Sequence, residues 1–277
     1  MKPVEPIHTV DLFPPLSREL LSVFKSLQPK DWAQSTICSP WTVKDVAAHL
    51  LGGNLGRLWN RDVALATQDY SPQHYDDLLR LINHNNALWV HAAERISPEI
   101  LIEFLELTDR RLDDHFRNLA PHEPARIKVA WASDSLPPNW FDIAREYTEK
   151  WLHQQHIREA VSRPLLTARF WLLPVLNTFM LGLPRTFRNT EAASGTSISV
   201  QITGDAGGEW SLVRQDSGWV LFEGHNPQAV CRVQIDQYLA WRLFTKGLSR
   251  DIVRRQVLID GDKTLGETVL EMVSIMA

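Results

Sequence analysis

The N-terminal half of the chain carries apolar residues at the spacing of amphipathic helices. From residue 17 to about 163, apolar side chains recur every three or four positions, as in helices with one buried face. Ser17 begins a short helix that ends near Leu27. Longer helices are predicted over about 42–66, 73–95, 98–119 and 140–161. Because the connections between them are short, the pattern predicts an antiparallel four-helix bundle.

Polar residues and prolines mark where these helices begin. The segment TVKD at 42–45 has the form of a capping box, with an acidic residue three positions after the threonine. Pro98 follows Ser97 and suits the first turn of a new helix. The stretch PPN at 137–139 interrupts the pattern, and the last long helix begins near Trp140. These signals mark where the separate helices begin.

After residue 196 the apolar positions change to a period of two. Ile198, Val200 and Ile202 alternate with polar residues, which is typical of a strand with one buried face. The turn DSG at 216–218 separates two such segments and favours a hairpin. Strands are expected over 197–203, 209–215, 218–224, 230–236 and 256–261, and helices over 236–247 and about 263–275. This order predicts an α+β domain.

The two patterns predict three parts of the chain. These are an all-α bundle at 1–163, a helical connector and linker at 164–196, and the α+β domain at 197–277. The connector holds the most apolar stretch, residues 170–184, which Pro174 and Asn177 interrupt. That stretch is shorter than the ~20 residues a membrane-spanning helix needs. No transmembrane segment is therefore predicted.

Composition narrows the function classes. Hydrophobic residues make up 44% of the 277 residues, enough for a substantial core, and the formal net charge is −4. That charge gives no electrostatic reason to expect a nucleic-acid partner. Cys38 and Cys231 match no CxxC spacing, which argues against a disulfide framework, and the N-terminus lacks an apolar signal core. We expect a soluble cytoplasmic protein with no membrane partner and leave its oligomeric state open.

The stretch EKWLHQQH at 149–156 places a carboxylate and two imidazoles on one predicted helix. Glu149, His153 and His156 share a face, because a helix turns about 100° per residue. Imidazole nitrogen and carboxylate oxygen are both ligands of zinc and similar divalent ions. A further ligand must come from another helix, and His49 is the best candidate because it lies on the apolar face of its helix. The spacing thus allows a metal site.

Simpler interpretations compete with the metal site. A lone histidine on an apolar face is usually a hydrogen-bonded core residue. A Glu–His pair is often a solvated surface pair that contributes only a few tenths of a kcal/mol. Trp151 and Leu152, however, indicate a partly buried helix, where a carboxylate needs a partner or an ion. Spacing alone leaves both interpretations open.

Several segments resemble one protein family. WTVKDVAAHL (41–50) resembles the first histidine motif of the DinB-like superfamily. EKWLHQQHIREA (149–160) resembles the E-x-x-x-H motif of the mycothiol-dependent maleylpyruvate isomerase branch of that superfamily. LPRTFR (183–188) resembles the segment that joins the two domains of that branch. The C-terminal pattern is similar to the branch's second domain, which is sterol carrier protein-like. The resemblance covers nearly the whole chain.

By this resemblance, His49, Glu149 and His153 match the family's three metal ligands, most often ligands of zinc. Glu149 indicates the isomerase branch, because many DinB-like proteins have histidine there. His156 stands where the branch has aspartate. It is a spare ligand, a proton carrier or a group that orients a ligand, and we favour the last. Asp45 either orients the ring of His49 or caps the helix.

The resemblance implies a metal- and thiol-dependent isomerase or thiol transferase. Three protein ligands leave open positions on an ion, where an entering thiol loses its proton. The thiol is expected to belong to a small cosubstrate such as mycothiol, and the substrate is a small electrophile. Cys38, in a loop, and Cys231, on a predicted strand, are expected to be packing residues. A non-enzymatic metal- or lipid-binding protein and a metal-dependent hydrolase are the alternatives.

Other residues give weaker signals. Arginines near the ligand helices, and one in the second domain, are candidates to bind a substrate carboxylate, and we do not choose among Arg57, Arg61, Arg145, Arg158 and Arg242. The chain has eleven tryptophans. Core packing is their expected role, with a pocket wall as the alternative. No catalytic residue is identified beyond the metal ligands.

Overall fold

The computed structural model describes residues 1–58, 75–126, 128–133 and 135–275. The chain forms two compact units. The helical unit contains Thr9–Ala120 and Glu146–Leu165. The sheet unit contains Met1–His8, Pro121–Arg145 and Leu166–Met276. The two units therefore interleave along the sequence.

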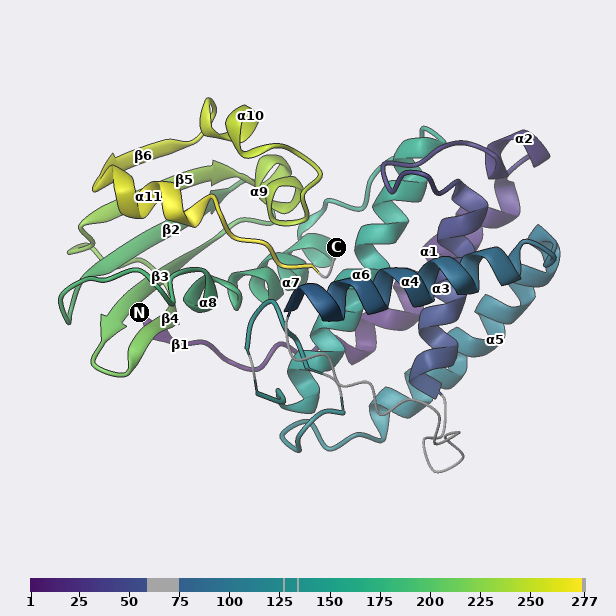
Figure 1. Cartoon of the computed structure of the whole chain (residues 1–277), viewed down its shortest axis with the longest axis horizontal. Helices are drawn as coiled ribbons and strands as arrows, with labels where there is room; N and C mark the ends of the chain where they lie inside the picture. Colours follow the sequence, from purple (N-terminus) through teal and green to yellow (C-terminus); the bar gives the residue numbers. More distant parts are fainter. Residues whose placement is uncertain (59–74, 127, 134, 276–277) are drawn as a thin grey trace. The chain divides into compact units, whose positions relative to one another are not determined.

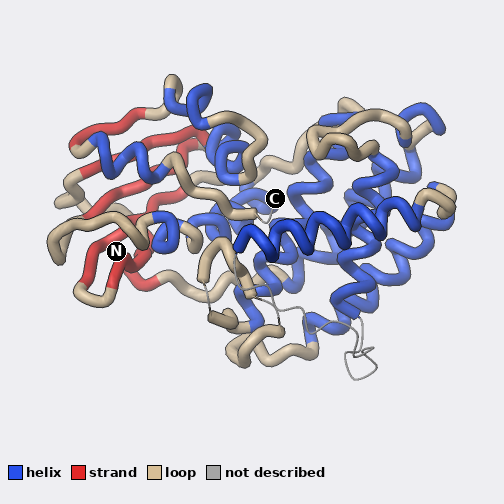
Figure 2. Tube along the Cα trace, viewed as in Figure 1, coloured by secondary structure: helices blue, strands red, loops and turns tan. Residues whose placement is uncertain are grey.

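The helical unit consists of helices joined by loops (Figures 1 and 2). Its helices are α1 (Phe13–Ser26), α2 (Pro29–Trp32), α3 (Val43–Leu58), α4 (Tyr75–Ala93) and α5 (Pro98–Arg117), after the 3-10 helix η1 (Val10–Leu12), and α6 (Asn139–Ala160) joins it from Glu146 onward. Helix α3 packs against α4 and α5, and α1 packs against α5. The predicted all-α N-terminal bundle is confirmed.

Local signals place the helix ends. The backbone N–H of Thr42 donates to the Asp45 carboxylate at 2.9 Å, and the Asp45 N–H faces the Thr42 hydroxyl at 3.4 Å, so the predicted capping box is confirmed. The Ser97 hydroxyl accepts from the backbone N–H of Ile100 at the start of α5. Helix α1 begins at Phe13, four residues before the predicted start, because a proline fits the first turn, where no intrahelical donor is needed.

The core of the helical unit lies between α1, α3 and α5. Val43, Val46 and Ala47 on α3 and Leu101 on α5 have no exposed surface. Phe24 of α1 stacks on Trp32, with ring centroids 5.0 Å apart. Burying each large aliphatic side chain is worth roughly 1.5–3 kcal/mol, so this core holds α3 firmly.

The sheet unit is built on a six-stranded mixed sheet with the strand order β1-β4-β3-β2-β5-β6 (Figure 1). The strands are β1 (Lys2–Pro3), β2 (Ser197–Thr203), β3 (Gly208–Gln215), β4 (Gly218–Glu223), β5 (Cys231–Asp236) and β6 (Leu258–Gly261). The β2–β5 pair is parallel and the other pairs are antiparallel. The α+β prediction is confirmed, whereas β1 was missed because two residues show no period.

The sheet unit also contains helices that precede, connect or follow the strands. They are α7 (Arg169–Met180), α8 (Leu183–Thr186), α9 (Gln237–Phe244), α10 (Arg250–Arg254) and α11 (Lys263–Val269). Helix α11 contacts β5 and β6, α9 contacts β2 and β5, and α8 contacts β4. Helix α11 ends before the predicted residue 275, because Ser274 is buried and its backbone N–H donates to the Phe244 carbonyl at 2.9 Å.

Some predictions fall on parts of the chain outside the described residues. The predicted end of the 42–66 helix, the start of the 73–95 helix, Trp59 and Arg61 belong there. Within the described ranges, no helix is long and apolar enough to cross a membrane.

Candidate metal centre

Helices α3 and α6 bring the three predicted ligands together. Nε2 of His49 lies 3.2 Å from Oε1 of Glu149, and Nε2 of His153 lies 3.1 Å from the same oxygen. One ligand atom from each residue lies within 4.8 Å of the other two. The imidazole rings of His49 and His153 are 4.7 Å apart and nearly perpendicular. Two nitrogens and an oxygen thus converge on a volume the size of one ion.

The surroundings partly bury all three side chains and keep the Glu149 carboxyl ionised. The side chains of His49 and His153 are 13% and 12% exposed, and that of Glu149 is 33% exposed. Burial alone would raise the pKa of the Glu149 carboxyl. The neighbouring His153 and His49 outweigh this effect and hold the pKa well below its ordinary value. A carboxylate beside two imidazole nitrogens is a donor set that suits a divalent ion such as zinc.

Trp41, just before α3, packs against His49, and Asp45 lies in the first turn of α3. The Trp41 ring lies 5.1 Å from the His49 ring, so at least this tryptophan packs against the candidate centre rather than only in a core. Asp45 accepts hydrogen bonds from the Thr42 backbone N–H and hydroxyl, at 2.9 and 2.7 Å. Of the two roles left open for Asp45, the structure shows the helix cap.

Cys38 and His156 lie beside this centre. Sγ of Cys38 is 3.0 Å from Nδ1 of His156 and 4.0 Å from Nδ1 of His153. Burial, with a smaller contribution from the Glu149 charge, raises the pKa of the Cys38 thiol to about 11, although the Thr36 hydroxyl opposes the rise. Cys38 packs against the core of the helical unit, as predicted, but its contact with His156 was not predicted. The one available signal was its place in the loop directly before the helix of His49.

Two of the candidate arginines are held by acidic partners within the helical unit. Nε of Arg57 lies 3.1 Å from Oε2 of Glu146, and both side chains are at least nine-tenths buried. Arg158 donates to the Glu19 carboxylate at 2.7 Å and to the Pro164 carbonyl at 2.9 Å. Arg57, two turns after His49 on α3, lies on the helix that carries the first ligand.

The other two described candidates, Arg145 and Arg242, belong to the sheet unit. Nε of Arg145 lies 3.5 Å from Oδ1 of Asp142, one turn earlier on α6. The Arg242 guanidinium stacks over the Trp241 ring, 4.2 Å from its centroid.

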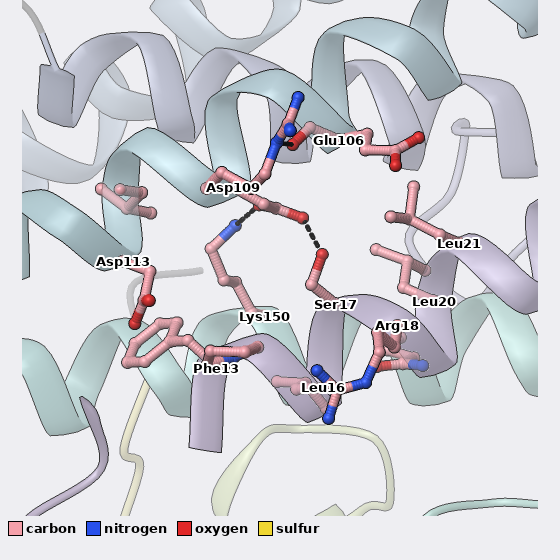
Figure 3. Close-up of a pocket in the computed structure, with 14 residues that line it drawn as sticks. Phe13, Leu16, Ser17, Arg18, Leu20, Leu21, Glu106, Asp109, Asp113 and Lys150 are labelled. Carbon is pink, nitrogen blue, oxygen red and sulfur yellow. Dashed lines mark hydrogen bonds and ion pairs between the residues drawn. The ribbon is translucent and has the colours of Figure 1, made fainter. Parts of the chain in front are cut away.

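A cavity of about 260 Å³ lies elsewhere in the helical unit, between α1, α5 and α6 (Figure 3). Its wall includes Asp109, which accepts a hydrogen bond from Ser17 at 2.5 Å and forms an ion pair with Lys150 at 3.0 Å. The buried Asn54 amide donates to the same carboxylate at 2.8 Å. These polar groups already have hydrogen-bond or ion-pair partners among themselves. We therefore interpret them as groups that hold the helices together, and not as a ligand-binding site.

Solved structures give distant similarities. Two crystal structures of the mycothiol-dependent maleylpyruvate isomerase, one of them a mutant, are 13% and 12% identical to the chain, with TM-scores of 0.44 and 0.42. Each match covers 84% of this chain and 88% of the other. A UbiJ-SCP2 ubiquinone synthesis protein matches 32% of this chain and 84% of its own, at 16% identity and a TM-score of 0.24. No curated protein matches in sequence.

A family model gives the assignment. The model described as the mycothiol maleylpyruvate isomerase N-terminal domain matches residues 13–158, from the start of α1 almost to the end of α6. The matched region includes His49, Glu149 and His153, and it covers more than half of the chain. The chain therefore belongs to the family of the mycothiol maleylpyruvate isomerase N-terminal domain.

Proposed function

We propose that the chain is a metal-dependent enzyme that uses a low-molecular-weight thiol, either as an isomerase or as a thiol transferase. The observation that carries the proposal is the convergence of His49, Glu149 and His153 from two helices. Membership of the family supports it. Zinc is the favoured ion, because two imidazoles and a carboxylate are a frequent ligand set of catalytic zinc.

The protein residues would hold the ion and leave room beside it. The Glu149 side chain is one-third exposed, so the donors can be approached from solvent. Gly53 follows His49 by one turn on α3, and a Cβ at Gly53 would meet no atom within 4 Å. A bound divalent ion would favour the thiolate form of a thiol, whose ordinary pKa is about 8.5. The site therefore suits a small thiol cosubstrate such as mycothiol.

The isomerase reaction needs a thiolate and a conjugated cis double bond. The sulfur adds to one carbon of that bond, and the electron pair moves into the conjugated carbonyl. The remaining carbon–carbon single bond rotates. Return of the electron pair then expels the thiolate and leaves the trans isomer. In the transferase reaction, the same addition to an electrophile is followed by protonation, and the thioether is the product.

The test combines metal analysis with turnover. The purified full-length chain should contain about one divalent ion and should isomerise maleylpyruvate only when mycothiol is present. His153→Ala should lower kcat/KM at least about 100-fold, because it removes a ligand rather than an outer-shell partner. His91→Ala is the matched control, because His91 is an exposed histidine on α4 whose side chain is 79% accessible.

Two other results would point to the alternatives. Turnover of an ester or amide that needs metal but no thiol would favour the hydrolase. Co-purified lipid, together with no turnover under any of these conditions, would favour the binding protein. Either result would contradict the thiol-dependent reaction.

A further inference from the structure

A second set of donors shares a residue with the candidate centre. Cys38, His153 and His156 each place one ligand atom within 4.8 Å of the other two. We propose that these residues form a thiolate-containing site for a thiophilic divalent ion such as Zn²⁺, Co²⁺ or Cd²⁺. The site does not depend on the proposed enzymatic activity.

The two sets approach His153 from opposite edges of its ring. Its Nε2 lies 3.1 Å from Glu149, whereas its Nδ1 lies 4.0 Å from the Cys38 sulfur. The His156 ring is nearly perpendicular to the His153 ring, with centroids 5.4 Å apart, and its Nδ1 lies 3.0 Å from the same sulfur. The Cys38 sulfur thus has one nitrogen of each histidine within 4.0 Å, and the His153 nitrogen on this side is not the one that faces Glu149.

The chemistry of the second set differs from that of the first. Thiolate sulfur with imidazole nitrogen selects zinc and softer ions, whereas carboxylate with imidazole also accepts harder ions such as manganese. Binding displaces the Cys38 thiol proton, which is released to the buffer. The resulting charge is the same in both sets, since each contributes one anionic ligand to a doubly charged ion.

The loop before α3 holds Cys38 in position. The Trp41 backbone N–H donates to the Cys38 carbonyl at 2.9 Å, and the Cys38 N–H donates to the Thr36 hydroxyl at 3.2 Å. The same hydroxyl donates to the Trp41 carbonyl at 2.8 Å. His156, only 8% exposed, is fixed on α6. Little rearrangement is therefore needed to bring sulfur and nitrogen onto an ion.

Sharing His153 makes the two sets alternatives. A neutral imidazole has one nitrogen lone pair available and carries a proton on its other nitrogen. An ion on Nδ1 therefore leaves Nε2 protonated and unable to bind an ion with His49 and Glu149. One ion per chain, distributed between the two sets according to its softness, is the expected stoichiometry.

Cobalt spectroscopy tests the site directly. Co²⁺ is added to the metal-free full-length chain, without oxygen and without any added thiol. A sulfur-to-cobalt charge-transfer band should appear in the near ultraviolet and saturate at or below one equivalent. Cys38→Ser should abolish the band, and His156→Gln should weaken binding at that band at least about tenfold. Cys231→Ser is the matched cysteine control and should leave the band unchanged.

His49→Ala separates this inference from the proposed function. It disrupts the first set, so thiol-dependent turnover should be lost while the cobalt band persists. A wild-type chain without the band, or a band that survives Cys38→Ser, overturns the inference. Should Cys38→Ser fail to fold, X-ray absorption of the zinc complex of His49→Ala decides, since the site requires one sulfur at about 2.3 Å and a shell without sulfur overturns it.

Discussion

His49 and Glu149 lie a hundred positions apart in the sequence, yet Nε2 of one is 3.2 Å from Oε1 of the other across α3 and α6. His153 reaches the same carboxylate oxygen at 3.1 Å from its own helix. The donor set therefore exists only while the two helices are packed together. Its ligand role can be tested by changing a donor atom while the packing is left intact.

Glu149→Gln is the first such change, because the amide keeps the shape of the side chain and loses the charge. The affinity for Mn²⁺ should fall at least about tenfold, since manganese favours carboxylate over amide and thiolate ligands. Titration of the metal-free chain with Mn²⁺, followed by electron paramagnetic resonance, measures the change. The chain should keep its helical circular dichroism.

Cys38→Ser is the control for this manganese experiment. It alters a residue 3.0 Å from His156 but leaves His49, Glu149 and His153 in place, so Mn²⁺ affinity should stay within about threefold of wild type. Equal manganese affinities in wild type, Glu149→Gln and His153→Ala would rule out the first donor set.

Sequence spacing was enough to place Glu149 and His153 on one helical face. The apolar face around His49 made it the candidate ligand from another helix, and the family resemblance implied the same three residues. The helices themselves follow from the 3.6-residue period and the strands from the alternation after residue 196. Cys38 could not be found in this way. It lies in a loop without any period, and its contact with His156 spans 118 positions. The two-residue strand β1 was also not predicted, because it is too short to show a period and pairs only with the distant strand β4.

Asp109 should be a major determinant of stability. Its ion pair with Lys150 is buried, with side chains 10% and 11% exposed. Asp109→Ala should lower the free energy of unfolding by about 3–5 kcal/mol, because it leaves a buried ammonium without its counter-charge. Urea denaturation measures the loss. The exposed pair Lys25–Glu106 provides the control, since Glu106→Ala should cost at most about 1 kcal/mol. Similar losses of unfolding free energy in both variants would show that the buried Asp109–Lys150 pair is not a major determinant of stability.

Two adjacent glycines of α3 should respond in opposite ways to alanine. A Cβ at Gly52 would lie 2.5 Å from the Trp89 indole, whose N–H donates to the Ala48 carbonyl at 2.7 Å. Gly52→Ala should therefore destabilise the protein by about 1–3 kcal/mol. A Cβ at Gly53 meets nothing within 4 Å, so Gly53→Ala should stabilise it by up to about 1 kcal/mol through helix propensity. Thermal unfolding of both variants is the measurement, and equal shifts would refute the packing argument.

Cys231 should make the free energy of unfolding of the sheet unit fall as the pH becomes alkaline. Burial, followed by the charges of Asp262 and Asp260, raises the pKa of this thiol from 9.0 to about 11. Because the folded pKa is the higher one, the contribution is complete below pH 9 and is lost as the pH rises through about 11. Asp262→Asn keeps an oxygen that can accept from Thr264 at the start of α11 and removes one charge.

In a Cys38→Ser background, thiolate absorbance should therefore titrate at lower pH when Asp262 is replaced by asparagine. The loss of unfolding free energy between pH 9 and 11 should also be smaller in the Asp262→Asn variant. The reason is that the folded and unfolded pKa values of Cys231 move closer together. Identical titration midpoints with aspartate and asparagine at this position would show that the charge of Asp262 does not raise the pKa of Cys231.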